Sequence, residues 1–240
     1  MSLPNVFAVV SIALLLGACT QYSKHDNPTA QNKEYLLDSA LSKFTNVYDY
    51  GSAEYKNNEL VLRSTGNWFY LTNKTYKDFI FTAEVLMPDV TEYSNAGFIF
   101  RAQVKETDKG KVAIGYQAEV DPSPRKWSGG LYDQGRRQWL YPEHKTRSQK
   151  DEKFEKSFLP EWSPKQANAY KHLQWNKYKI VAVGNEIKIY VNGILTTHVL
   201  DSTDAEGFIG LQHHGSEKLK ATGDTDNIVK YRNVFVTELD

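Results

Sequence analysis

The sequence predicts an all-β protein built as an antiparallel sandwich of two sheets. Three observations support this fold class. Short runs of alternating apolar and polar residues recur along the 240-residue chain, turn residues separate these runs, and helical periodicity is nearly absent. Many short strands with few helices are typical of a sandwich or jelly roll, whose concave sheet offers a cleft.

The first predicted strands lie in the N-terminal half of the domain. Runs at 59–64 and 68–72 flank a glycine-containing turn. The run 78–87 alternates, so its odd-numbered and even-numbered residues occupy opposite faces of a strand. The run 96–104 alternates in the same way, which places Arg101 on the polar face of its strand.

The C-terminal half carries the clearest strand signals. Three alternating runs fill 175–200, separated by Gly-Asn at 184–185 and by Asn-Gly at 192–193. Asn-Gly between such runs is a strong hairpin signal. The runs 207–215 and 229–239 predict the last strands. Short helices are predicted at 33–44 and 163–174.

The N-terminal residues are expected to direct export. The apolar run 6–19 is too short for a comfortable membrane span and is typical of a secretory signal, although no Lys or Arg precedes it. Its end, Leu16-Gly17-Ala18-Cys19, resembles a bacterial lipobox. We expect a signal peptide at 1–18, a lipidated Cys19 with a flexible tether over 19–38, and one jelly-roll domain over 39–240. The alternative is a plain cleaved signal, or a start site placed too late.

Composition restricts the partners. The chain has 29 basic and 29 acidic residues and no basic stripe, which argues against a nucleic-acid partner. Cys19 is the only cysteine, so neither an intramolecular disulfide nor a cysteine-based zinc site can form. Through its lipid alone, the protein would be held at a membrane of the bacterial cell envelope, in the periplasm or at the outer membrane.

One strand and the loop after it carry the candidate chemistry. Alternation in 114–121 places Gln117, Glu119 and Asp121 together on the face opposite the core. Carboxylates two residues apart on a strand lie about 7 Å from each other, so they could divide acid and base roles. The alternative is that they are ordinary solvated carboxylates.

The loop and strands that follow are rich in aromatic and charged residues. Flat rings cover the apolar faces of sugars, and Arg side chains bind hydroxyl groups, so this composition predicts an oligosaccharide or glycoside ligand. The alternative is that these rings close one end of the sandwich. The candidates for sugar binding are Trp127, Tyr132, Arg136 and Trp139.

Three residues from other strands are expected to join this site. Arg101 would orient the sugar or pair with Glu119 or Asp121. On the strand 207–215, Gln212 and His214 share a face, whereas His213 lies with the core residues. An imidazole beside a carboxylate suits base catalysis or metal ligation, so a divalent metal remains open although no third ligand has a diagnostic spacing.

Seven blocks in order, among them SNAGFIFRAQ, GYQAEVD, GGLYD and GFIGLQHHG, resemble the 3-keto-disaccharide hydrolase family, also described as glycosyl hydrolases. The resemblance covers 39–239. It implies a concanavalin A-like lectin/glucanase jelly roll, export, and base-catalysed elimination next to a 3-keto group, followed by addition of water. We expect no organic cofactor. A base and an enolate-stabilising cation or metal would serve that reaction.

The resemblance also implies roles for individual residues. Family members often carry Tyr-Glu-x-Gln where this chain has Tyr116-Gln117-Ala118-Glu119, so the carboxylate must come from Glu119. We expect Glu119, Asp121 and His214 to be catalytic, and Arg101, Gln117, Gln212 and the loop residues to bind the sugar. Glu119-Val120-Asp121 also resembles half of the laminarinase motif, but its second Glu is missing. The alternatives are a non-catalytic carbohydrate-binding lipoprotein and a purely structural envelope protein.

Overall fold

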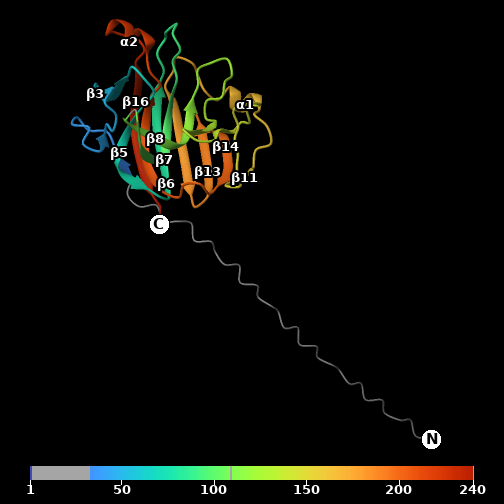
Figure 1. The fold of residues 1–240 in the computed structure, drawn as a ribbon. Helices are drawn as coiled ribbons and strands as arrows, with labels where there is room; N and C mark the ends of the chain where they lie inside the picture. Colours follow the sequence, from blue (N-terminus) through green and yellow to red (C-terminus); the bar gives the residue numbers. More distant parts are fainter. Residues whose placement is uncertain (2–32, 109, 240) are drawn as a thin grey trace.

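A computed structural model describes Met1 and residues 33–108 and 110–239. The strands from Glu34 onward form a sandwich of two antiparallel sheets (Figure 1). The all-β sandwich predicted from the sequence is therefore confirmed. The expected signal peptide, Cys19 and most of the tether lie outside the described residues. Within the described part of the chain, no helix has the length and hydrophobicity needed to cross a membrane.

One sheet has nine strands among the described residues. Its order is β11-β14-β13-β12-β6-β16-β4-β3, and β1 pairs with β16. The hairpins predicted around 184–185 and 192–193 are confirmed as β12-β13 and β13-β14. The strands are β1 Glu34–Tyr35, β3 Ser52–Lys56, β4 Glu59–Arg63, β6 Phe79–Leu86, β11 Phe154–Ser157, β12 Asn176–Val183, β13 Glu186–Val191, β14 Ile194–Asp201 and β16 Val229–Glu238.

The second sheet has seven strands in the described residues and carries the candidate site. Its order is β10-β9-β8-β7-β15-β5-β2. The helices α1 Pro164–Ala167 and α2 Glu217–Thr222 lie outside the strand layers (Figure 1). The strands are β2 Phe44–Thr45, β5 Trp68–Tyr76, β7 Ala96–Thr107, β8 Gly110–Val120, β9 Leu131–Gln134, β10 Gln138–Tyr141 and β15 Gly207–His213.

The main core lies between the sheets and follows the predicted alternation. In β6 the inward residues Phe79, Phe81, Ala83 and Val85 are all buried, whereas the residues between them are half-buried. Burying a Phe or Val side chain stabilises a fold by about 1.5–3 kcal/mol. On β8, Tyr116, Ala118 and Val120 belong to the same core, as alternation predicts. Gln117 and Glu119 consequently point to the outer face of the seven-stranded sheet.

The N-terminal boundary differs from the expected one. Glu34 and Tyr35 pair with Val236 and Phe235 of β16, so part of the expected tether belongs to the sheet. The helix predicted at 33–44 is wrong, because this segment extends the sheet and inserts Leu36 and Leu37 into the core. The helix predicted at 163–174 is confirmed only as the short α1.

Candidate functional site

Glu119 lies at the centre of a chain of buried amides on the outer face of β8. Only 7% of its surface is exposed. The Nε2 atom of Gln117 donates to Oε2 of Glu119 at 2.5 Å, and Nδ2 of Asn95 donates to Oε1 at 3.1 Å. Gln117 also donates to Oε1 of Gln212 at 3.0 Å, and Gln212 donates to Asn67 at 2.8 Å. These amides orient the carboxylate from both sides.

A glycine makes room for this arrangement. A Cβ atom at Gly97 of β7 would lie 2.7 Å from Nε2 of Gln117. Only a residue without a side chain therefore allows Gln117 to lie across β7 and reach Gln212 of β15. The buried Oε1 atom of Gln117 and Oδ1 of Asn95 have no hydrogen-bond partner among the described residues. Such atoms mark a place where a ligand or water can bind.

The surroundings of Glu119 alter its acidity. Burial and the nearby charge of Asp121 raise the pKa of the Glu119 carboxyl to about 7, although hydrogen bonds from Asn95 and Gln117 act in the opposite direction. A carboxyl group with a pKa near neutrality exchanges protons readily at physiological pH. Glu119 therefore has the chemical properties of a general base.

Asp121 is close to Glu119 but is occupied by its own loop. It is 1% exposed, and its Oδ1 atom accepts a hydrogen bond from the backbone of Ser123 at 3.0 Å. Its Oδ2 atom binds Arg125 through Nε at 3.1 Å and Nη2 at 3.0 Å. In this structure Asp121 positions the loop and its guanidinium, whereas the catalytic role predicted for it remains a prediction.

Three predicted aromatic residues come together next to β8, where Tyr132 of β9 lies opposite Gln117. Trp127 and Tyr132 contact Trp139 edge-on, with ring centroids 4.8 and 5.3 Å apart. The Arg125 guanidinium lies 5.5 Å from the Trp139 ring, and Arg147 lies 5.8 Å from the Tyr132 ring. We call Trp127, Tyr132 and Trp139 the aromatic cluster. The Nε1 atom of Trp139 is buried without a hydrogen-bond partner in the described residues.

The two histidines separate as predicted. His213 is fully buried and structural, because its ring binds the carbonyl of Asn227 at 2.9 Å and accepts from the backbone of Gly215 at 3.0 Å. His214 is half-buried and contacts the exposed ring of Tyr93 edge-on at 5.2 Å. Burial lowers the pKa of His214, which favours the neutral imidazole. Its backbone donates to the carbonyl of Asn95 at 3.2 Å, so His214 adjoins the amide chain.

Arg101 does not reach this site, and its predicted role there is wrong. The pairing of β7 with β8 shifts register between Phe100 and Gln103, and Arg101 adopts a φ of 47°. The side chain is thereby fully buried among turns. It donates to the carbonyls of Lys77, Gly184 and Asp204 at 2.7 to 3.1 Å.

Arg136 is also outside the site, so its predicted contact with sugar is wrong. Its guanidinium binds Asp133 at 2.7 Å and Asp204 at 2.5 Å. The neighbouring Arg137 binds Asp133 and Asp201 in the same buried network. These arginines satisfy buried carboxylates and are structural.

Comparison with known proteins identifies the family. Residues 32–237 match the model of the 3-keto-alpha-glucoside-1,2-lyase-like domain. The chain belongs to this family. The predicted family resemblance is therefore confirmed, and the lyase-like domain is a carbohydrate-related domain. No protein with a curated description matches the chain in sequence.

Solved structures share the fold of the lyase-like domain. A proposed glycosyl hydrolase from Parabacteroides distasonis has a TM-score of 0.53 and 15% identity, covering 87% of this chain and 100% of its own. A second one from the same organism has a TM-score of 0.50 and 14% identity, covering 83% and 90%. The carbohydrate-binding module CBM66 from Bacillus subtilis has a TM-score of 0.47 and 18% identity, covering 80% and 93%.

Several residues of the site were not found from the sequence. Asn67, Tyr93, Asn95, Arg125 and Arg147 all lie in loops, where no periodicity predicts the direction of a side chain. Of these residues, Arg125 alone could have been predicted from the sequence, because it lies within the loop rich in aromatic and charged residues. Among the described residues, no group of three or more His, Cys, Asp or Glu side chains is placed to hold a metal ion. The metal dependence of the lyase-like domain stays an open prediction.

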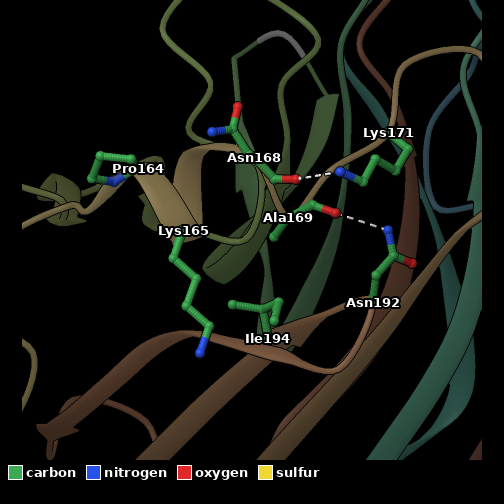
Figure 2. A pocket seen from close by; sticks show the side chains of 7 residues that line it. All are labelled: Pro164, Lys165, Asn168, Ala169, Lys171, Asn192 and Ile194. Carbon is green, nitrogen blue, oxygen red and sulfur yellow. Dashed lines mark hydrogen bonds between the residues drawn. The ribbon is translucent and has the colours of Figure 1, made fainter.

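Cavities lie around α1 and the loop that follows β8. One of 360 Å³ is lined by Asp121 and the prolines after it, together with residues near α1. Another of 540 Å³ lies between α1 and the β13-β14 hairpin (Figure 2). Beside it, Lys171 donates to the carbonyl of Asn168 and Asn192 to that of Ala169 (Figure 2). A third of 490 Å³ adjoins Trp127.

Proposed function

We propose that the lyase-like domain cleaves glycosides that carry a 3-keto group, with Glu119 as the base. The observation that carries this proposal is a buried carboxyl with a pKa of about 7, oriented by two amides. The proton at C2 of a 3-keto sugar is acidic because the adjacent carbonyl delocalises the negative charge of the enolate. A base near neutrality can remove such a proton at physiological pH.

The reaction proceeds by elimination. Glu119 takes the proton from C2, and the electrons of the C2–H bond form an enolate on the C3 oxygen. When the carbonyl re-forms, a double bond appears between C1 and C2 and the C1–O bond to the leaving group breaks. The departing oxygen takes a proton from Glu119 or from water. Addition of water across the new double bond would complete a hydrolysis.

Two groups beside Glu119 are suited to stabilise the enolate. Arg125 carries a positive charge, and its position is fixed by Asp121. The neutral His214 can donate one ring N–H to a developing oxyanion. The aromatic cluster would cover the apolar face of the sugar.

A second candidate function is carbohydrate binding without catalysis. The aromatic cluster and the unpartnered atoms of Gln117 and Asn95 favour it as much as they favour an enzyme. A retaining glycosidase mechanism has less support, because Asp121, the carboxylate beside Glu119, is already bound to Arg125.

An activity assay distinguishes the two functions. It measures turnover of 3-keto-glucosides and of ordinary glucosides by the purified protein, once with added divalent metals and once with a chelator. We expect Glu119→Gln to lower kcat about 10²- to 10⁴-fold while sugar binding survives. Glu84→Gln is the matched control, because Glu84 is a strand glutamate on the other sheet. Full activity of Glu119→Gln would refute the mechanism, and binding without turnover in the wild type would favour the second function.

We also propose that the protein is exported and held in the bacterial cell envelope by a lipid on Cys19. The lipobox-like end of the apolar N-terminal run supports this. Expression of the full chain should place it in the membrane fraction, and Cys19→Ala should release it. Wild-type protein in the soluble fraction would contradict the proposal.

A further inference from the structure

Two cavities adjoin α1 and share Asn168 in their walls. The first, of 360 Å³, is lined by Tyr170 together with Pro122 and Pro124, and we call it the Tyr170 cavity. The second, of 540 Å³, lies between α1 and the β13-β14 hairpin, and we call it the hairpin cavity (Figure 2). Both volumes fall within the range of about 300–1,000 Å³ typical of ligand sites.

Lysine side chains line both cavities, and none of them pairs with a carboxylate among the described residues. Lys126 lines the Tyr170 cavity with His172, whereas Lys165 and Lys171 line the hairpin cavity (Figure 2). The Nζ atoms of Lys126 and Lys171 donate, within the described residues, only to oxygens of Asn168, at 3.4 and 2.9 Å. Lys165 has no hydrogen-bond or ion-pair partner there. The charge of these lysines is therefore available to an anion.

The sequence around α1 explains this local excess of positive charge. Residues 162–185 contain four lysines and His172 but no aspartate or glutamate, although the whole chain has equal numbers of basic and acidic residues. Asp121 also lines the Tyr170 cavity, but its side chain is buried and is bound by Arg125 at 3.0 Å. The electrostatic potential in both cavities therefore favours anions.

The Tyr170 hydroxyl indicates that the ligand also carries neutral polar groups. Its oxygen is buried and has no hydrogen-bond partner among the described residues. Burial and the charge of Asp121 raise the pKa of Tyr170 to about 12, so the hydroxyl stays protonated and can donate. A buried donor of this kind requires a ligand or a water molecule as its partner. The Tyr170 ring beside it can cover the apolar face of a sugar.

Other cavities of the sandwich carry the opposite charge. The cavity of 490 Å³ beside Trp127 is lined by Glu143 and Glu161 but by one cation, Lys150. A further cavity near α2 is lined by three acidic residues and one lysine. The positive charge is thus a particular property of the two cavities at α1.

We propose that the two cavities at α1 form an accessory site for an acidic saccharide, one whose sugar rings carry carboxylate or sulfate groups. Lys126, Lys165 and Lys171 bind the anionic groups. The Tyr170 ring covers a sugar face, and its hydroxyl donates to a sugar oxygen. The site does not depend on the reaction proposed at Glu119, because it holds the protein on acidic glycans whether or not the domain is an enzyme.

The test is calorimetric titration with three oligosaccharides of equal length: an oligogalacturonate, a sulfated galactan oligomer and a neutral gluco-oligosaccharide. All proteins are full-length and carry Cys19→Ala, so that no lipid contributes to binding. We expect at least one of the two acidic oligosaccharides to bind, and the one that binds more tightly identifies the anionic group as carboxylate or sulfate.

Variants locate the binding at α1. Lys126→Gln combined with Lys165→Gln should weaken binding of the acidic oligosaccharide about tenfold, and Tyr170→Phe should weaken it about three- to fivefold. The matched control combines Lys105→Gln with Lys111→Gln, which removes the same charge from exposed lysines of the β7-β8 hairpin, at the end of β8 opposite Asp121. At that distance the control should change the affinity less than about twofold.

Three results would overturn the site: no binding of either acidic oligosaccharide, no loss in the α1 lysine pair, or equal losses in the α1 pair and the control pair. Vesicles of phosphatidylglycerol test the other anionic partner, a membrane surface. Vesicle binding that is lost in the α1 pair, without binding of acidic oligosaccharides, would assign these lysines to a membrane and would also refute the proposal. Binding of the neutral oligosaccharide, which the α1 variants should leave unchanged, reports separately on the Glu119 site.

Discussion

The raised pKa of Glu119 makes a prediction about stability that does not depend on knowing the substrate. The folded protein binds the Glu119 proton with a pKa of about 7, against an ordinary value of 4.5. Folding therefore favours the protonated form. This stabilising contribution is fully present below pH 4.5, and it is lost as the pH rises through 7.

The magnitude follows from the difference between the two pKa values. Because one pH unit corresponds to about 1.4 kcal/mol, the wild type loses about 3 kcal/mol of unfolding free energy between pH 4 and 8 at this group. Glu119→Gln abolishes that loss. The new amide has a nitrogen facing an amide donor of Asn95 or Gln117, which costs about 1–3 kcal/mol, but equally at every pH.

The assay is urea unfolding of the wild type and Glu119→Gln at pH 4 and pH 8. The variant should gain about 3 kcal/mol relative to the wild type between these two values. Glu84→Gln is a control of opposite sign. Burial raises the Glu84 pKa, but hydrogen bonds from Asn233 and Arg232 outweigh this and lower it, so Glu84 stabilises the fold above its ordinary pKa. A change below about 1 kcal/mol for Glu119→Gln would refute the reasoning.

Three further predictions concern the surrounding structure. Arg137→Met should lower the unfolding free energy by about 3–5 kcal/mol, because the buried carboxylate of Asp201 loses its guanidinium partner and that of Asp133 keeps only Arg136; unchanged urea unfolding would contradict this. Gly97→Ala should displace Gln117 and weaken sugar binding in calorimetry, with the protein still folded by circular dichroism; unaltered affinity would argue against the amide chain. His213→Ala should cost about 1–3 kcal/mol of stability in urea, whereas His214→Ala should mainly lower turnover; the reverse order would contradict the two assignments.

The sequence predicted the strands well because the polarity of each strand residue indicates whether its side chain faces the core. Each alternating run, such as those of β6 and β8, buries one face. The period of two therefore predicted both the presence of a strand and which of its side chains point into the core. The same rule placed Glu119 and Gln117 on one outer face and separated His213 from His214. The residues of the aromatic cluster were instead predicted from the aromatic and charged composition of the segment that follows β8.

The rule failed where the backbone departs from regular pairing. Alternation places Arg101 on the polar face of its strand. A register shift in β7 instead directs its side chain toward the backbone carbonyls of residues 77, 184 and 204. A bulge depends on the partner strand, which local sequence does not specify. Arg136 fitted a sugar site by composition, but its carboxylate partners come from distant segments.

The sequence by itself determined that the chain forms a β sandwich of a carbohydrate-related family and that Glu119 faces away from its core. Only the tertiary structure decided what surrounds that carboxyl: the Asn95 amide from another segment, the Gln117 amide held in place by Gln212, and a burial that raises its pKa. The reason is physical. Orientation along a strand is a local consequence of the pleat, whereas desolvation and charge interactions depend on groups that only the complete fold brings together.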